Sequence, residues 1–202
     1  MRLILLRHGE TVWNIDGRLQ GHDDSPLSER GIAQAEAITG YVRALAPARV
    51  VTSDLGRVRQ TAEIIGHADA PGEPRLRELD MGAWTGLRKA DLIAGKPGLY
   101  ADWRAGRYKP EGGEGWDDFV HRISSTLREW VHGGEGDLLA IVHSGVVRAA
   151  CCSFLGLKAA QLLPVTPGTL TILDFDAKDP AATPRLEGYN IGGFVPDIDA
   201  AD

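Results

Sequence analysis

The chain has 202 residues, 43% of them apolar, and carries 22 lysine and arginine residues against 28 aspartate and glutamate residues. This length supports one substantial hydrophobic core and is short for two, so we expect a single domain over residues 1–202. The net charge of −6 disfavours nucleic acid as a partner, because the field of the whole chain repels a polyanion.

The first apolar run, residues 3–6, is shorter than the core of a signal peptide and far shorter than a membrane span. We therefore expect a cytoplasmic protein with no membrane partner. The two cysteines, Cys151 and Cys152, are adjacent, a spacing that suits neither an ordinary disulfide nor a zinc site. They are expected to be reduced thiols packed inside the protein.

The first half of the chain alternates expected strands and helices. Residues 1–6 are almost wholly apolar, as in a strand that is buried on both faces of a parallel sheet. A helix over 28–45 follows, with Ser28 as its cap and apolar residues at helical spacing. A short buried strand at 50–51 and a second helix over about 55–65 complete this pattern.

The second half repeats the same order. The clearest helical periodicity covers 116–131, and an apolar strand over 137–142 leads through a polar turn into a helix over 146–154. Further strands are expected at 170–175 and at 186–190, before an acidic tail. This alternation predicts an α/β fold, a three-layer α/β/α sandwich with a mostly parallel central sheet, in which ligands bind beyond the carboxyl ends of the strands.

Residues 86–115 interrupt the alternation and are rich in glycine, proline, aromatic and basic residues. We expect an excursion that covers the functional site. Within it, residues 88–109 carry six basic and two acidic side chains, a local net charge of 6 − 2 = +4. Two interpretations stay open: the segment guides anionic substrates to the site, or it is a solvated loop. The first predicts that neutralising Lys96, Arg104 and Arg107 raises the Michaelis constant.

Two histidines stand where expected parallel strands end, His8 after the first strand and His143 after the strand over 137–142. Arg7 directly precedes His8, and Gly9 follows it in a tight turn. The guanidinium fork of an arginine pairs with two oxygens of a phosphate dianion. An imidazole near its own pKa can be neutral and nucleophilic at working pH. Together these residues predict an anion site at this edge of the sheet.

Four ordered blocks of the sequence resemble those of the histidine phosphatase superfamily, which includes the phosphoglycerate mutases. The blocks are Arg7-His8-Gly9-Glu10-Thr11 with Asn14, Gln20-Gly21, Asp24, Pro26-Leu27, Gly31 and Gln34-Ala35; Ser53-Asp54-Leu55-Gly56-Arg57 with Gln60-Thr61-Ala62; Leu76-Arg77-Glu78 with Gly82, Trp84 and Gly86; and Val142-His143-Ser144-Gly145 with Arg148. Each block is short, but their common order over residues 1–148 is specific. The resemblance implies a phosphoglycerate mutase-like fold.

The resemblance also implies a covalent phosphohistidine on His8. Glu78 would protonate the leaving group and then activate water. By the same resemblance, Arg7, Arg57 and His143 counter the charge on the equatorial phosphate oxygens, and the phosphate pocket is lined by Asn14, Gln20, Gly21 and Ser144. No step calls for a metal or another cofactor, and the expected partner is a small anionic phosphorylated substrate.

Several of these residues admit another interpretation. Glu78, which has charged neighbours in the sequence, could be a solvated surface carboxylate. Arg57 and Arg59 fall on different faces of a helix, and the motif register favours Arg57 for the pocket. His22 lies beside two aspartates, but their spacing favours a hydrated loop over a metal site. Trp116, at the start of a strongly periodic helix, is expected to pack in the core.

Three functions are compatible with the resemblance. The first is a phosphatase, in which water clears the phosphohistidine. The nearest alternative is a mutase, which excludes water and returns the phosphoryl group to another hydroxyl. The third is a catalytically idle module that binds a phosphorylated partner. Trp84 and Gly86 match the phosphatase branch, whereas Thr85 and Gly115 depart from its usual residues, and the short chain favours hydrolysis. The sequence names neither the phosphomonoester nor the oligomeric state.

Overall fold

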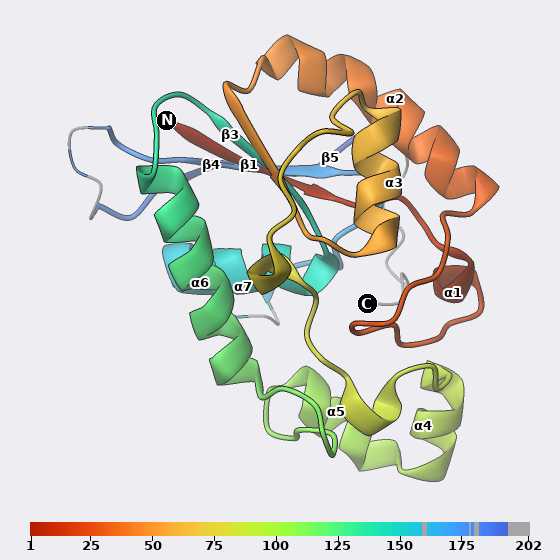
Figure 1. The fold of residues 1–202 in the computed structure, drawn as a ribbon. Helices are drawn as coiled ribbons and strands as arrows, with labels where there is room; N and C mark the ends of the chain where they lie inside the picture. Colours follow the sequence, from red (N-terminus) through yellow and green to blue (C-terminus); the bar gives the residue numbers. More distant parts are fainter. Residues whose placement is uncertain (159–160, 178, 180–181, 194–202) are drawn as a thin grey trace.

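The computed structural model describes residues 1–158, 161–177, 179 and 182–193. Its centre is a five-stranded sheet in the order β2-β3-β1-β4-β5 (Figure 1). The strands are β1 (Arg2–Arg7), β2 (Arg49–Thr52), β3 (Leu138–Val142), β4 (Leu170–Asp174) and β5 (Arg185–Ile191). All of the strands expected from the sequence are present, and the acidic tail lies outside the described residues.

The sheet is mixed. β1 and β3 pair in parallel, as do β2 and β3, whereas β4 runs antiparallel to both β1 and β5. Parallel neighbours need a crossover helix, and the chain supplies one between each of the strands β1, β2 and β3. The α/β class is therefore confirmed, but a mostly parallel pairing is found only in the half of the sheet that these three strands form.

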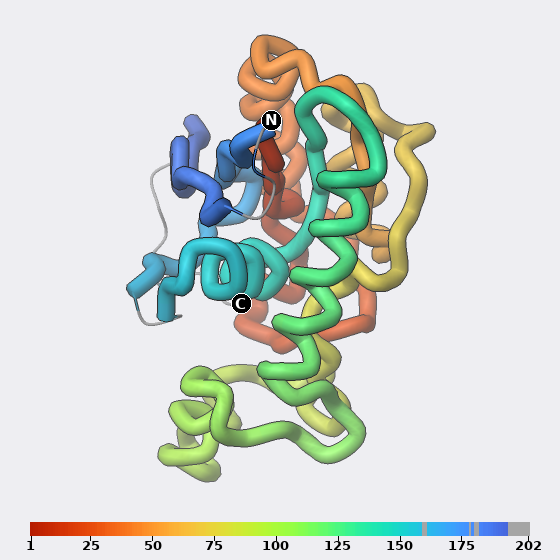
Figure 2. Tube along the Cα trace, turned by 90° about the vertical axis from the view of Figure 1, so that its left-hand side faces the viewer, coloured from red at the N-terminus to blue at the C-terminus, as the bar shows by residue number. Residues whose placement is uncertain are grey.

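Two helical layers cover the sheet, as the sequence predicted. On one face lie α2 (Glu29–Leu45) and α3 (Gly56–Ile64), and on the other lie α6 (Trp116–His132) and α7 (Ser144–Leu155) (Figures 1 and 2). The side chains of β1 alternate between the two layers. Ile4 and Leu6 pack with residues of α2 and α3, and Leu3 and Leu5 pack with residues of α6 and α7.

The start of α2 packs closely against the turn that follows β1. Ser28 caps the helix, because its hydroxyl accepts a hydrogen bond from the N–H of Gly31 at 3.0 Å. A Cβ on Gly31 would lie 1.9 Å from the carbonyl oxygen of Glu10, and a Cβ on Gly9 would lie 2.3 Å from that of Gly31. Only glycine at these two positions allows the helix to fix the turn in place.

Residues 86–115 contain two short helices, α4 (Lys89–Gly95) and α5 (Pro97–Arg104), which lie beyond one end of the sheet (Figures 1 and 2). An aromatic cluster attaches this segment to the rest of the chain. Trp84 stacks on Tyr108 with 5.3 Å between ring centroids, and Trp103 contacts Trp84 at 5.9 Å and Tyr100 at 5.3 Å. The remaining short helices are α1 (Val12–Ile15), η1 (Pro74–Leu76) and η2 (Gly82–Trp84).

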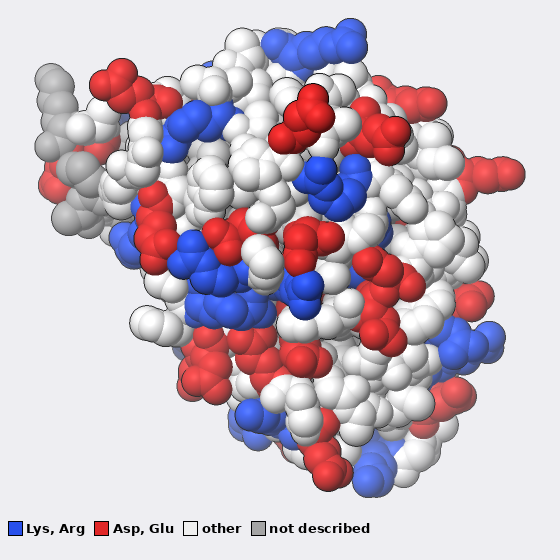
Figure 3. Space-filling view, viewed as in Figure 1, with Lys and Arg blue, Asp and Glu red and all other residues white. Residues whose placement is uncertain are grey.

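Acidic and basic side chains are interspersed on the face shown in Figure 3. Ion pairs in the protein include Arg75 with Glu73 and Glu129. None of the described helices is long and apolar enough to span a membrane. Cys151 is buried, Cys152 is partly buried, and both are free thiols, as their adjacency predicted.

Candidate active site

His8 and His143 meet at the carboxyl ends of neighbouring strands. Arg7, the last residue of β1, is in register with Val142, the last residue of β3, and the N–H of His8 donates to the carbonyl of Val142 at 3.0 Å. The two imidazole rings are edge to face with 5.3 Å between centroids. The structure therefore brings together the two histidines that the sequence placed at separate strand ends.

His8 is held in one orientation in a buried environment. The side chain is 3% exposed, and its Nδ1 lies 2.7 Å from the carbonyl oxygen of Gly9. Burial lowers the pKa of His8 well below its usual value, and the nearby Arg57 and Arg7 lower it further. The ring is therefore neutral at neutral pH. Since a carbonyl only accepts, Nδ1 carries the proton, and Nε2 keeps the lone pair that a nucleophile needs.

Two buried arginines line the same cavity as His8. Arg7 and Arg57 are each 1% exposed, and burial lowers the pKa of Arg7 to about 10 and also lowers that of Arg57. Both remain charged at neutral pH. Arg7 Nη1 donates to the carbonyl of Val165, and Arg57 donates to Gly21 O at 2.9 Å and to Asp24 Oδ1 at 3.1 Å. These contacts hold two cations beside His8 where a dianion can bind.

Arg59 lies away from the pocket, as the helix spacing predicted. It donates to the hydroxyl of Thr52 at 2.9 Å and to the carbonyls of Ala68 and Ala70, each at 2.5 Å. These bonds connect α3 to the end of β2 and to the segment that follows α3. The comparison with Arg57 shows that the motif register chose the arginine whose side chain reaches the site.

His143 is fully buried next to the start of α7. Its Nε2 lies 2.9 Å from Ser53 Oγ, within hydrogen-bonding distance, and its Nδ1 has no hydrogen-bond partner among the described residues. Burial lowers the pKa of His143 well below its usual value, with Arg57 as the next largest cause. A bound dianion would favour the protonated form of His143. Phosphate binding is therefore expected to change the protonation state of this imidazole.

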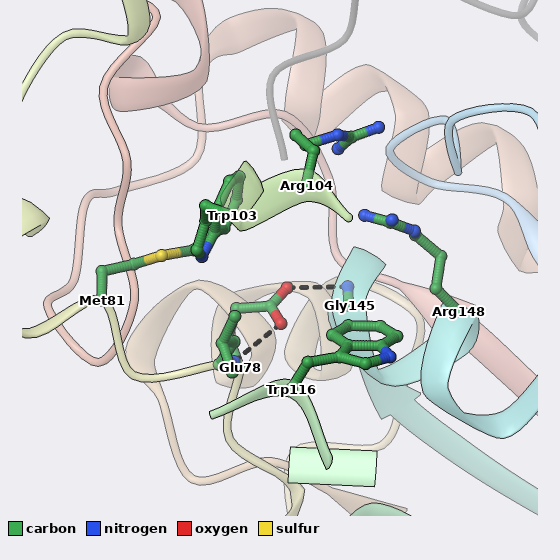
Figure 4. Close-up of a pocket in the computed structure, with 8 residues that line it drawn as sticks. Glu78, Met81, Trp103, Arg104, Trp116, Gly145 and Arg148 are labelled. Carbon is green, nitrogen blue, oxygen red and sulfur yellow. Dashed lines mark hydrogen bonds between the residues drawn. The ribbon is translucent and has the colours of Figure 1, made fainter. Parts of the chain in front are cut away.

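Glu78 is a buried carboxylate, so the interpretation of this residue as a solvated surface group is wrong. It is 7% exposed, and its oxygens accept from the N–H of Leu79 at 2.8 Å and from that of Gly145 at 2.9 Å. A Cβ on Gly145 would lie 2.1 Å from Glu78 Oε1. Figure 4 shows the two hydrogen bonds and the carboxylate at the wall of a cavity. The absence of a side chain at Gly145 therefore leaves room for the Glu78 carboxylate at the start of α7.

The backbone of Glu78 is also held from two sides. Its carbonyl oxygen lies 2.9 Å from His22 Nε2 and 3.4 Å from Arg122 Nη2. Arg122 forms a bidentate pair with Glu114, with distances of 2.9 Å and 2.6 Å, and donates to the carbonyl of Arg77 at 3.1 Å. The charged sequence around Glu78 therefore belongs to a network that positions this residue.

These groups line a cavity with about 270 Å³ of empty space. A glycine is required at position 21, where φ is +55° and a Cβ would lie 3.0 Å from Met81. Every predicted site residue lines the cavity except His143, whose ring contacts that of His8. The lining residues are Arg7, His8, Asn14, Gln20, Gly21, Arg57, Glu78, Met81 and Ser144.

Sequence reasoning missed a second cavity that adjoins the first. It has about 360 Å³ of empty space and shares Glu78 and Met81 with the cavity around His8. Trp116 packs against the core, as expected, and in addition lines this cavity, beneath the guanidinium of Arg148 at 5.5 Å. The presence of Arg148 in the fourth block was the signal that could have indicated it. The lining residues are Glu78, Leu79, Met81, Trp103, Arg104, Trp116, Gly145 and Arg148.

The acidic residues near His22 take part in the site as hydrogen-bond acceptors. Asp24 accepts from the N–H of Gly56 at 2.6 Å and from Arg57, while His22 contacts the carbonyl of Glu78. No group of three or more histidine, cysteine, aspartate or glutamate residues that could hold a metal ion occurs in the described part of the chain. The roles of His22 and Asp24 are therefore explained by the positioning of Glu78 and Arg57.

A buried, strand-end histidine that lines a cavity together with two buried arginines is an arrangement suited to phosphoryl transfer in an α/β fold. The model of the histidine phosphatase superfamily (branch 1) matches residues 3–185, and the chain belongs to this superfamily.

Relatives with different activities share this likeness. The chain is 34% identical over 170 residues to a glucosyl-3-phosphoglycerate phosphatase of Mycolicibacterium vanbaalenii, covering 77% of this chain and 75% of the relative. It is 35% identical over 167 residues to a probable phosphoglycerate mutase GpmB of Salmonella paratyphi C, covering 79% of this chain and 77% of the relative. The solved structure of a mycobacterial glucosyl-3-phosphoglycerate phosphatase in complex with VO3 matches with a TM-score of 0.84 and 31% identity, over 94% of this chain and 98% of that chain.

Proposed function

We propose that this protein is a phosphomonoesterase that hydrolyses small phosphorylated metabolites through a phosphohistidine on His8. The observation that carries the proposal is the neutral, buried His8, whose Nδ1 donates to Gly9, so that Nε2 keeps its lone pair, and which lines one cavity with Arg7 and Arg57. A nucleophile, its orientation and two countercharges are therefore present in one enclosed site.

In the first step, the lone pair of His8 Nε2 attacks phosphorus and the bond between phosphorus and the ester oxygen breaks. Protonated Glu78 gives its proton to the departing oxygen, which leaves as an alcohol. In the second step, Glu78 takes a proton from water as the water oxygen attacks phosphorus. The bond from phosphorus to Nε2 breaks, its electron pair returns to the neutral imidazole, and phosphate is released.

The charge that develops on the transferred group is countered by Arg7, Arg57 and His143. Each hydrogen-bond donor aimed at such charge contributes a large part of the barrier reduction in a site that excludes water. The side chains of Asn14, Gln20 and Ser144 and the backbone at Gly21 supply neutral donors around the same cavity. The names of two relatives, a phosphatase and a probable mutase, support a phosphoryl-transfer reaction.

The experiment that tests the proposal is acid-quench trapping of labelled phosphate. The wild-type protein should release phosphate from a panel of metabolite phosphomonoesters and become labelled during turnover. His8→Ala should lose the label and at least about 10⁴-fold in kcat. His132→Ala, which changes an exposed histidine at the end of α6, is the matched control and should keep both. Binding of phosphate without label or turnover would instead indicate a catalytically idle module.

Hydrolysis and phosphoryl transfer to a second hydroxyl are separated by one further assay. The protein is incubated with 3-phosphoglycerate and a trace of 2,3-bisphosphoglycerate, and phosphate release is compared with isomerisation. We expect phosphate release, because Trp84 and Gly86 match the phosphatase branch. Interconversion of the phosphoglycerates without release of phosphate would assign the mutase reaction.

A further inference from the structure

The segment 164–169, which leads into β4, holds Arg7 through both its backbone and its side chain. The N–H of Arg7 donates to the carbonyl of Thr169 at 3.1 Å. Arg7 Nη1 donates to the carbonyl of Val165, and both Val165 and Thr169 are buried. Since Arg7 lines the cavity around His8, the position of this segment helps to set where the guanidinium lies in that cavity.

Asn190 of β5 holds this segment with its side-chain amide. Nδ2 donates to the carbonyl of Pro164 at 2.8 Å, and Oδ1 accepts from the N–H of Thr166 at 2.9 Å. The hydroxyl of Thr169 also donates to Oδ1, at 3.1 Å. Because a carbonyl only accepts and an N–H only donates, these partners fix which end of the amide is nitrogen and which is oxygen. The amide of Asn190 therefore binds the chain on both sides of Val165.

One peptide group connects Asn190 with Arg7. The N–H of Thr166 and the carbonyl of Val165 belong to the same peptide unit, which is planar and trans, so that its N–H and C=O point in opposite directions. Asn190 Oδ1 fixes the N–H on one side of this unit, and the carbonyl on the other side accepts from Arg7 Nη1. The amide of Asn190 thus sets the direction of the carbonyl that holds the guanidinium.

The backbone at Asn190 departs from regular strand geometry. β5 forms one edge of the sheet (Figure 1), and its register with β4 shifts between Leu170 and Ile172, where β5 has an extra residue. Asn190 lies in this β-bulge with φ of +54°. A bulge redirects a side chain, and asparagine is among the few residues with a Cβ that adopt the left-handed region. This conformation is explained if the amide has to reach the segment 164–169.

We propose that Asn190 is a positioning residue for phosphoryl transfer, which acts through the peptide group between Val165 and Thr166 on the guanidinium of Arg7. This inference rests on the proposed phosphatase function and adds to it a residue that does not line the cavity around His8. Asn190 touches neither the substrate nor the reacting atoms, so its side chain influences the reaction only through the place that Arg7 takes beside the phosphoryl group.

The test removes the amide and leaves the backbone unstrained. Asn190→Gly keeps the left-handed conformation, which glycine adopts freely, and loses the contacts to the segment 164–169. With p-nitrophenyl phosphate as substrate, kcat should fall about tenfold, because a small displacement of a group that stabilises the transition state slows the reaction steeply. Asn190→Asp, which tolerates positive φ and keeps the acceptor for the Thr166 N–H, should lose no more than about threefold.

A double-mutant cycle separates this role from a general effect on folding. In an Arg7→Met background the guanidinium is absent, so Asn190→Gly should change kcat by less than about twofold. A residue that only stabilises the fold would lower kcat by the same factor with and without Arg7. An equal loss of kcat in both backgrounds, or an unchanged kcat when Asn190→Gly is the only substitution, would overturn the inference.

The matched control uses Ala46, the other non-glycine residue with a positive φ in the described part of the chain. Ala46 is exposed and follows the last residue of α2, with φ of +46°. Ala46→Gly makes the same exchange of a left-handed residue for glycine and should leave kcat unchanged in both backgrounds. Thermal melts of every variant establish that kcat values are compared for folded proteins.

Calorimetric binding of inorganic phosphate tests the same role without turnover. In a His8→Ala background, Asn190→Gly should raise the Kd for phosphate by about threefold or more, because a displaced guanidinium pairs less well with the dianion. Ala46→Gly should leave this Kd unchanged. A raised Kd in a protein that hydrolyses no phosphomonoester would support the positioning role and refute the proposed function alone. Hydrolysis with an unchanged Kd and kcat in the Asn190→Gly variants would refute the positioning role alone.

Discussion

The cavity around His8 and the cavity around Trp103 share Glu78 and Met81, yet they are built in different ways. The first is formed at the ends of β1 and β3 and at the start of α3, where backbone hydrogen bonds and close glycine contacts fix each residue. The second is lined by aromatic rings and long side chains of α5, α6 and α7, among which Arg148 of α7 lies over the ring of Trp116 in α6.

The difference concerns how firmly each cavity is fixed. The groups that we propose to act on phosphorus lie at the ends of β1 and β3, at the start of α3 and in the segment around Glu78, and all of them are buried against a core that tolerates little displacement. Groups that line the second cavity lie largely on helices outside the sheet, where a change of side chain alters the cavity and leaves the strand ends in place. The predictions below test whether the two regions are independent.

The largest effect is expected for the buried arginine of the first cavity. Arg57→Met should lower kcat about 10²–10³-fold, because one of the charges that stabilise the transferred phosphoryl group is lost. Arg59→Met is the matched control on the same helix. It should keep kcat within about twofold and lower the free energy of unfolding by about 1 kcal/mol, since only structural hydrogen bonds are removed. Steady-state kinetics of both variants measure kcat, and urea denaturation measures their free energy of unfolding. Equal losses of kcat in the two variants would contradict the assignment of Arg57, rather than Arg59, to the phosphoryl group.

A smaller effect is expected where the two regions meet. Gly145→Ala would place a Cβ 2.1 Å from Glu78 Oε1, so the carboxylate has to move and kcat for alkyl phosphates should fall about tenfold to 100-fold. Gly40→Ala is the control, because a Cβ at that position in α2 meets no atom within 4 Å. It should leave kcat unchanged and not destabilise the helix. If Gly145→Ala retains full activity on alkyl phosphates, Glu78 is not the proton donor.

The smallest effect concerns pH and stability. The pKa values of His8 and His143 are lowered in the folded protein, whereas in the unfolded chain they return to about 6.5. Below about pH 6.5 the unfolded chain therefore binds more protons, and the free energy of unfolding falls as the pH decreases, by up to about 1.4 kcal/mol per pH unit for each histidine. Above this pH the contribution is fully present.

Urea denaturation at pH 7.5, 6.0 and 5.0 measures this slope. His8→Asn should show a shallower loss of stability between pH 6.5 and 5.0 than the wild-type protein. His121→Asn, which changes an exposed histidine on α6, should keep the wild-type slope. The same slope in all three proteins would mean that His8 is not held neutral in the folded state.

Much of the first cavity followed from local sequence. An apolar strand that ends in Arg7-His8-Gly9 and another that ends in His143 can be recognised without a structure, because burial on both faces removes polar residues from a strand. The α2 cap at Ser28 and the choice of Arg57 over Arg59 followed from short-range geometry of helices. All of these features depend on residues that are neighbours in the chain.

Other features depended on contacts between distant segments. The antiparallel pairing of β4 with β1 joins strands that are more than 160 residues apart in the chain. No local pattern specifies this pairing. The charged neighbours of Glu78 left open the alternative of a solvated carboxylate, but the residue is buried, and His22 and Arg122, the latter paired with Glu114, contact its backbone carbonyl. Trp103 and Arg148, far apart in sequence, line one cavity only after α5 and α7 have packed.

The sequence by itself determined the α/β class, the two histidines at strand ends and the family. These features depend on apolar runs and short ordered motifs, which are patterns of residues that are close together in the chain. The tertiary structure alone decided the tautomer of His8, the burial of Glu78 and the donors around the second cavity. These depend on which polar atoms find partners once the chain is folded, and hydrogen-bond partners and burial are properties of three-dimensional neighbours.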